Sequence, residues 1–228
     1  MRRNWKTDFR SFYYEAAPIP EEPTIYPEST ALLVIDLQNT YLKAPRTPEE
    51  QNRWAWFDQR IKQTVLPQLT TLLAHSREHG IPVIYARIAC VEEQGRDRSL
   101  SQKKPGFNNL FLPKDDWESQ IIDEIAPRPN EIVVLKTTDS ALTGTNLRLM
   151  LSNMGIRTVI CTGIFTDQCV SSTVRSLADE SFDVLLVEDC CAAATEELHE
   201  HELRVLNWIY CQVVQAQDLL EFKVEGTK

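Results

Sequence analysis

Glycine is scarce in this sequence, with seven residues among 228. None of them forms the Gly-x-Gly-x-x-Gly pattern, in which a glycine turn after a strand admits the pyrophosphate of a dinucleotide. Histidine is rarer still, with four residues, and no Cys-x-x-Cys pair or mixed Cys/His spacing indicates a zinc site. We therefore expect neither a nucleotide-binding protein nor a metalloprotein, and we expect no cofactor.

Long apolar runs and an excess of basic residues are missing as well. No apolar stretch is long enough to span a membrane or to form the core of a signal peptide. The net charge of −9 disfavours nucleic acid and anionic membrane surfaces as partners. The six cysteines lack the spacing of a disulfide framework, so free thiols are the default. These absences predict a cytoplasmic protein whose partner is a small molecule.

Short apolar runs alternate with segments of helical periodicity along most of the chain. The apolar runs predict buried strands at 31–35, 82–86, 132–135, 157–161, 183–187 and, more briefly, 212–214. Apolar residues at helical spacing predict helices over 58–78, 146–153, 169–179 and 196–208. Strands that alternate with helices form βαβ units. We therefore predict an α/β fold, a three-layer α/β/α Rossmann-like domain with a mostly parallel sheet over residues 31–228.

Two segments break this alternation. Residues 1–30 are polar and contain four prolines, which predicts an extended N-terminal arm that either packs on a neighbouring subunit or is loosely held. Residues 88–120 are also polar, and we expect a long excursion over the sheet. Excursions of this length are often functional.

Polar residues stand where the predicted strands end. Asp36 follows the first strand, Arg87 the second and Lys136 the third, while the fourth leads through a glycine turn to Cys169. Parallel sheets bind ligands beyond the carboxyl ends of their strands. We therefore expect these side chains to converge at one edge of the sheet.

Asp36, Lys136 and Cys169 form a chemically sufficient set for nucleophilic catalysis. An unperturbed thiol has a pKa of about 8.5, so forming a thiolate at pH 7 costs roughly 2 kcal/mol. A helix N-terminus at Cys169 and the cation of Lys136 would lower that cost. Asp36 would accept the thiol proton, and the turn at Gly163 would aim N–H groups at an oxyanion. The competing interpretation is that Cys169 is a small buried hydrophobe, which describes the other five cysteines well.

Three blocks of sequence resemble the isochorismatase-like cysteine hydrolase superfamily, in the right order over residues 30–215. They are Val34-Ile-Asp36-Leu-Gln38-Asn39, Lys136 with Ser140-Ala141, and Gly163-Ile-Phe-Thr-Asp-Gln-Cys169-Val170. The resemblance implies a Rossmann-like homodimer or homotetramer with Asp36, Lys136 and Cys169 as its catalytic triad. It also implies a cis peptide between Ile164 and Phe165, and an oxyanion held by the N–H groups of Phe165 and Cys169.

Departures from the family pattern narrow the expected activity. The Asp-x-His metal site of nicotinamidases is absent after the first block, and Cys169 argues against the vinyl-ether chemistry of true isochorismatases. The stretch Gly95-Arg-Asp-Arg-Ser99 resembles the ureidoacrylate and carbamoyl-amide branch, whereas Leu142 replaces a common phenylalanine. We therefore predict a cysteine-dependent amidohydrolase that cleaves a C–N bond of a small linear amide or ureide through a thioester. Ureidoacrylate-like, carbamoyl-amide and biuret-like substrates all fit. The alternative is a catalytically idle oligomeric binding protein of the same fold.

Substrate contacts are predicted beside the triad. The five residues proposed for this role are Gln38, Asn39, Trp54, Arg87 and Thr166. Arg96, Arg98 and Lys103 join Arg87 as candidates to hold a substrate carboxylate. Trp54 would belong to an aromatic wall, although packing between helices is the competing interpretation for it.

Overall fold

The computed structural model describes residues 3–226 and contains a six-stranded parallel sheet. The strand order is β4-β3-β2-β5-β6-β7, and every neighbouring pair is parallel. The strands are β2 (Thr30–Ile35), β3 (Val83–Ile88), β4 (Ile132–Lys136), β5 (Thr158–Ile164), β6 (Asp183–Ala192) and β7 (Gln212–Val214). Each continuous apolar run predicted as a buried strand is therefore a strand of this sheet.

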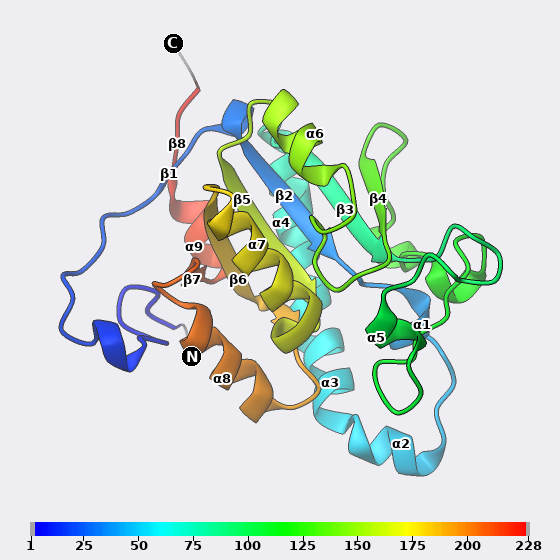
Figure 1. Cartoon of the computed structure of the whole chain (residues 1–228). Coiled ribbons are helices and arrows are strands. Elements are labelled where there is room, and N and C mark those ends of the chain that lie inside the picture. The colour runs from blue at the N-terminus through cyan, green and yellow to red at the C-terminus, as the bar shows by residue number, and fades with distance from the viewer. Residues whose placement is uncertain (1–2, 227–228) are drawn as a thin grey trace.

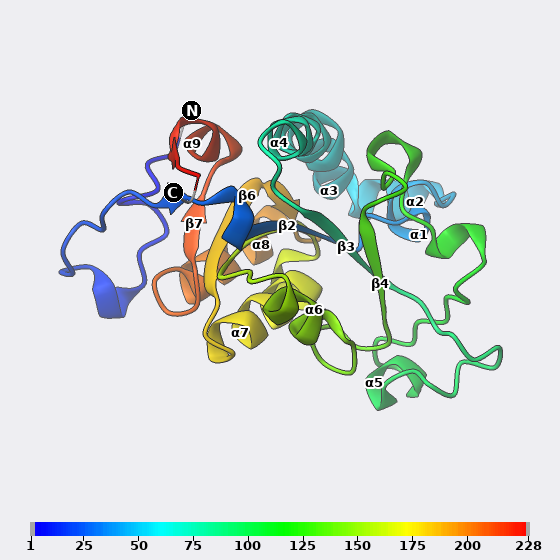
Figure 2. The same cartoon turned by 90° about the horizontal axis from the view of Figure 1, so that it is seen from above.

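Helices cover both faces of the sheet, which makes the predicted three layers (Figures 1 and 2). One face carries α4 and α9, and the other carries α6, α7 and α8. The helices are α1 (Asn39–Leu42), α2 (Pro48–Arg53), α3 (Ala55–Arg60), α4 (Leu66–Glu78), α5 (Leu100–Lys103), α6 (Leu147–Asn153), α7 (Ser171–Asp179), α8 (Glu196–Leu206) and α9 (Ala216–Glu221). Two π-helical turns, Ile61–Val65 and Thr166–Val170, lead into α4 and α7.

Alternate side chains of the central strand β2 feed two separate cores. Leu33 and Ile35 pack with the helices α6, α7 and α8, whereas Leu32 and Val34 pack with α4 and α9. All four side chains are buried because a strand between two helical layers has no solvent-facing side. This packing explains why the run Ala31 to Ile35 is apolar throughout rather than alternating.

Strand β6 is longer than the apolar run that predicted it. The sequence indicated an end at Val187, before two acidic residues, but the strand continues to Ala192. Its register against β5 slips: Cys161 pairs with Leu186, whereas Gly163 pairs with Cys191. The extra residues form a bulge, a feature that re-aims side chains. Glu188 and Asp189 lie in this bulge and are buried.

The two irregular segments flank opposite edges of the sheet. The N-terminal segment runs beside β7, and the excursion that contains α5 lies beside β4 (Figure 2). Trp5 and Phe9 are buried, and the short strand β1 (Thr24–Ile25) pairs with β8 (Lys223–Val224). These contacts tie both described ends of the chain to the domain. Within residues 3–226, no helix combines the length and apolarity needed to cross a membrane.

Gly163 allows β5 and β2 to approach each other closely near their carboxyl ends. Its φ is +119°, and a Cβ added there would lie 2.0 Å from the carbonyl oxygen of Ile35. No other residue fits this approach between β5 and β2, because a side chain would collide with backbone. Asp36, which follows β2, and Ile164, the last residue of β5, are thereby brought close to one another.

Candidate active site

Asp36 leaves β2 in a left-handed conformation, with φ of 55°. Aspartate adopts this conformation more readily than most residues, because its short polar side chain bonds locally. The turn directs the carboxylate across the end of β3, where Oδ1 accepts a hydrogen bond from the N–H of Ile88 at 3.0 Å. The side chain is 2% exposed, so its charge needs a partner inside the protein.

Lys136, the last residue of β4, supplies that partner. Its Nζ lies 2.7 Å from Oδ2 of Asp36 and donates to the carbonyl of Thr138 at 3.1 Å. Strand β3 separates β2 from β4, and Ile88 pairs with Lys136 in the β3–β4 register. The two charged residues therefore meet over the end of β3. Lys136 is fully buried, and a buried ion pair of this kind loses much stability when either partner is removed.

Cys169 lies on the π-helical turn Thr166–Val170, which continues directly into α7. The helical segment thus begins at Thr166, three residues earlier than predicted from sequence. The peptide between Ile164 and Phe165 is cis, as the family resemblance implied. Cys169 is 4% exposed and lies in the first helical turn, where the helix dipole favours negative charge.

The three side chains influence one another's protonation. Burial raises the pKa of Asp36, against the opposing charge of Lys136. Burial and then the charge of Asp36 raise the pKa of the Cys169 thiol well above its ordinary value. Burial disfavours the ammonium of Lys136, but the nearby charges of Asp36 and Cys169 outweigh it and raise its pKa. These directions favour a neutral thiol on Cys169 and a charged ammonium on Lys136.

Asp139 is a member of this cluster that the sequence analysis did not find. The Cys169 thiol contacts Oδ1 of Asp139 at 3.9 Å. Thr173 of α7 fixes this approach, because its hydroxyl donates to the carbonyl of Cys169 at 2.7 Å and accepts from the N–H of Ala141 at 3.0 Å. The loop after β4 is thus bound to the helix that carries the cysteine. The only sequence signal was an acidic residue three positions after Lys136.

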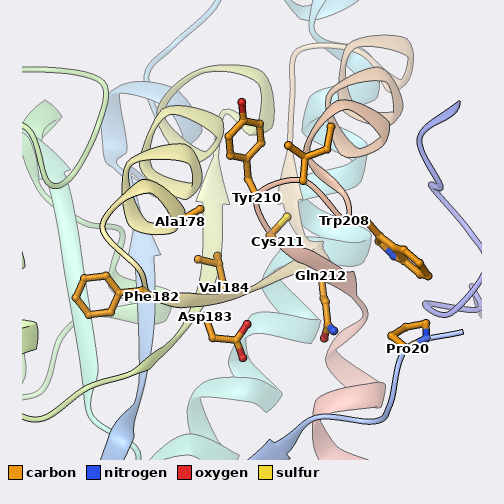
Figure 3. Close-up of a pocket in the computed structure, with 10 residues that line it drawn as sticks. Pro20, Ala178, Phe182, Asp183, Val184, Trp208, Tyr210, Cys211 and Gln212 are labelled. Carbon is orange, nitrogen blue, oxygen red and sulfur yellow. The ribbon is translucent and has the colours of Figure 1, made fainter. Parts of the chain in front are cut away.

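A hollow with a volume of about 590 Å³ opens against the turn that carries Cys169. Its lining consists of Asn108, Asp139, Asp167, Gln168, Ser171, Ser172 and Arg175. A second hollow of about 430 Å³ is lined by Pro20, Phe182, Trp208 and Tyr210 among others (Figure 3). It also touches Asp183 and Val184, at the start of β6, and so lies at the opposite end of the strands from the cysteine. Only the first hollow belongs to the candidate site.

The comparison with known families agrees with this geometry. A model of the isochorismatase domain matches residues 30–218. The ureidoacrylate amidohydrolase RutB of Pantoea ananatis (strain LMG 20103) is 31% identical in an alignment of 191 positions, which covers 78% of this chain and 75% of that protein. The chain belongs to the isochorismatase family.

Solved structures show the same architecture. An isochorismatase-like hydrolase from Alkaliphilus metalliredigens is 26% identical with a TM-score of 0.67, over 85% of this chain and 95% of that one. N-carbamoylsarcosine amidase from Thermoplasma acidophilum is 23% identical with a TM-score of 0.64, over 82% and 96% of the two chains. At 23% identity, the similarity to this amidase shows only that the two chains share a fold.

Three of the predicted substrate contacts serve the isochorismatase fold instead. The Gln38 amide is fully buried, and its Nε2 donates to the carbonyls of Ile88 and Ser119 at 2.9 and 2.7 Å. Arg87 donates to the carbonyls of Ser119 and Lys114 at 2.8 and 3.0 Å. Gln38 and Arg87 thus hold the excursion against the sheet.

Thr166 is the third corrected contact. Its side chain is buried, and its hydroxyl lies 2.8 Å from Nδ1 of His199 on α8. This contact anchors the cysteine-bearing turn to the neighbouring helix. Sequence alone gave the position of Thr166 on the turn but not the direction of its side chain.

Aromatic side chains stand around Phe165. Trp54 lies with its ring 5.8 Å from that of Phe165, and Tyr41 contacts the same ring edge-on at 5.4 Å. Burial and the charges of Asp36, Cys169 and Asp139 raise the pKa of Tyr41 well above its ordinary value, so its phenol stays neutral. Trp54 therefore packs against Phe165, and its role as a substrate contact stays a prediction.

Asn39 is the fifth of the predicted substrate contacts. It is largely buried, and its Nδ2 donates to the carbonyl of Trp117 at 2.9 Å.

Among residues 3–226, no cluster of three or more His, Cys, Asp or Glu side chains is placed to hold a metal ion.

The bulge of β6 places a buried acidic network behind the cysteine-bearing turn. Arg60 donates to Glu188 at 2.9 Å, and His199 links this pair to Thr166. Burial alone would raise the pKa of Glu188, but hydrogen bonding to His199 and the charge of Arg60 lower it to about 2. Burial raises the pKa of Asp189 from 3.8 to about 6, although Asp189 accepts a hydrogen bond from the N–H of Ala216 at 2.8 Å.

Asp189→Asn is expected to raise the free energy of unfolding at pH 8 by up to about 3 kcal/mol, the equivalent of a pKa change from 3.8 to about 6. The folded pKa lies above the unfolded one, so the ionised carboxylate destabilises the wild type above pH 6. That cost disappears as the pH falls from about 6 to 3.8. Urea unfolding should show a large gap between the two proteins at pH 8 and a closed gap below pH 4. An equal gap at both pH values would contradict the prediction.

Proposed function

We propose that this chain is a cysteine-dependent amidohydrolase that cleaves a C–N bond of a small linear amide or ureide through a thioester. The observation that carries the proposal is the buried Asp36–Lys136 ion pair beside Cys169, on the first turn of a helix that follows the end of β5. The amidohydrolase activity named for the RutB relative supports it. Trp54 and Asn39 are the remaining proposed substrate contacts from the sequence prediction.

Acylation begins when Asp36 accepts the proton of the Cys169 thiol. Its raised pKa makes it a stronger base than a surface aspartate. The thiolate attacks the carbonyl carbon, and the tetrahedral oxyanion is held by the N–H groups of Phe165 and Cys169. The C–N bond then breaks, and the leaving amine takes the proton from Asp36. Lys136 stabilises the negative charge on Asp36 whenever the proton has left it.

Deacylation returns the site to its starting state. A water molecule gives a proton to Asp36 as its oxygen attacks the thioester carbonyl carbon. The C–S bond breaks, the acid is released, and the proton on Asp36 returns to the Cys169 sulfur. The sum of both halves is one amide and one water converted to one acid and one amine or ammonia.

The direct test is ammonia release from a panel that includes biuret, malonamide and simple ureides, with mass spectrometry of the acid-quenched enzyme during turnover. We expect release from at least one compound, together with an added acyl mass on the peptide that contains Cys169. Release without any acyl mass on that peptide would contradict the thioester route. No release from any compound would favour the idle binding protein over the hydrolase.

We also propose that the chain acts as a homodimer or homotetramer in the cytoplasm. Its six cysteines are all free and buried, which suits a reducing compartment. Phe12 and Tyr13 on the N-terminal segment expose 81% and 80% of their surface, and exposed aromatic groups of this kind often mark contacts between subunits.

A further inference from the structure

Asp139 stands between the candidate nucleophile and the hollow. Its carboxylate contacts the Cys169 sulfur at 3.9 Å and also lines the hollow, as Asp167 does. The loop that carries it is bound to α7 twice, because Ser140 donates to Ser176 at 2.9 Å and Ala141 donates to Thr173. The position of Asp139 beside the sulfur is therefore part of the packed fold.

The charge of Asp139 is not balanced inside the site. Asp36 and Lys136 neutralise each other, which leaves Asp139 as the net charge beside the sulfur. Within residues 3–226, Asp139 makes no ion pair. The one cation that lines the hollow, Arg175, is paired with Glu202 of α8 at 2.9 Å. A molecule bound in the hollow thus meets the carboxylates of Asp139 and Asp167, of which Asp139 contacts the cysteine.

The basic residues that would attract a substrate carboxylate are occupied elsewhere. Arg87 bonds to two backbone carbonyls, as described above. Arg98 donates to the carbonyls of Gly95, Gln102 and Leu110, and Lys103 donates to the carbonyl of Arg96. Arg96 itself is paired with Glu92. These cations of the excursion therefore stabilise the excursion itself, and none of them lines the hollow.

The short distance from Asp139 to the sulfur defines which part of a substrate it meets. A carbonyl carbon poised for attack lies about 3–3.5 Å from the sulfur. A carboxylate 3.9 Å from the same sulfur then faces atoms one or two bonds from that carbon. Resting on the proposed hydrolase function, we propose that Asp139 selects amides and ureides by the group attached within one or two bonds of the scissile carbonyl carbon. A neutral or cationic group that carries N–H is accepted there, and a carboxylate is rejected.

Malonamide and malonamate form a matched pair for testing this selection, since they differ only in replacing an amide by a carboxylate. We expect the wild type to favour malonamide by at least about 100-fold in kcat/KM, because like charges a few ångströms apart in a partly buried site repel each other. Asp139→Asn should reduce that ratio to below about 10-fold. Asp179→Asn, the same charge change at the far end of α7, is the control and should leave the ratio as in the wild type.

A second measurement reads the local charge without turnover. The rate at which Cys169 is modified by a cationic aminoethyl methanethiosulfonate is divided by the rate for the anionic sulfonatoethyl reagent, and the quotient is normalised to a free thiol. The quotient does not depend on the thiolate fraction, since both reagents attack the same thiolate. We expect it to fall at least about tenfold in Asp139→Asn and to stay constant in Asp179→Asn. Mass spectrometry assigns the modification to Cys169.

The two measurements separate this inference from the proposed function. An unchanged quotient in Asp139→Asn, or equal hydrolysis of malonamate and malonamide by the wild type, overturns the role of Asp139 even if Cys169-dependent ammonia release establishes the hydrolase. A quotient that falls in Asp139→Asn supports the charge selection even if no panel compound is hydrolysed, and in that case only the hydrolase function fails.

Discussion

Replacing Cys169 with alanine is expected to lower kcat for amide hydrolysis by at least about 10⁴-fold, because the group that forms the covalent bond is gone. The fold should persist. The Cys169 side chain is small, so its truncation leaves only a small cavity, and the contact of its sulfur with Asp139 is long, at 3.9 Å. Ammonia release from the preferred panel compound measures the loss, and urea unfolding of the same samples shows that the protein remains folded.

Cys161→Ala is the matched control for this loss. Cys161 lies fully buried in β5, within the core that faces α6 and α7. Removing its sulfur should cost roughly 1 kcal/mol of stability through the small cavity left behind. It should leave kcat within a few-fold of the wild type, since no catalytic group touches it. A Cys169→Ala protein that kept more than a tenth of the wild-type kcat would refute the nucleophile assignment.

Lys136→Met is expected to destabilise the protein by about 3–5 kcal/mol at pH 8, because it leaves Asp36 buried without its counter-charge. The methionine matches the lysine in length, so little volume is lost. In the variant, the folded pKa of Asp36 is raised even further above the unfolded one. The deficit is therefore full at pH 8 and shrinks as the pH falls and Asp36 takes up a proton. Urea unfolding at pH 8 and pH 5 measures both effects.

Two further variants identify the cause of this destabilisation. Adding Asp36→Leu to Lys136→Met removes the stranded charge and should recover most of the lost stability, since buried ion pairs are often replaceable by apolar groups. Lys62→Met, at an exposed position of the π-helical turn before α4, should change stability by less than about 0.5 kcal/mol. A double variant no more stable than Lys136→Met alone would show that the lysine contributes through packing rather than charge.

The strands could be predicted from sequence because parallel strands buried on both faces must be apolar throughout. The same reasoning brought Asp36, Lys136 and Cys169 to one edge of the sheet, since each lies at a strand end or on the turn after one. It placed the end of β6 too early, because Glu188 and Asp189 are charged yet buried. Their partners, among them Arg60 at 2.9 Å from Glu188, come from distant parts of the chain and leave no local signal.

The partners of individual side chains at the site could not be predicted from sequence, for a related reason. Position after a strand shows which edge of the sheet a residue occupies but not which groups stand opposite it. Gln38 and Arg87 meet carbonyls of an irregular excursion, whose course no periodicity encodes. Asp139 reaches Cys169 because Thr173 joins the loop after β4 to the helical turn that carries the cysteine, and its bond to Ala141 connects residues 32 positions apart.

The hydroxyl of Thr173 has a further consequence for how this site can diversify. It joins the carbonyl behind the nucleophile to the backbone N–H of the loop that carries Asp139, so the two segments keep one geometry. The bonds in this link are made by backbone groups and by Thr173, and none of them involves the side chain at position 139. Evolution or a protein engineer can therefore exchange that side chain, and with it the charge presented to a ligand, without rebuilding the frame that aims the sulfur.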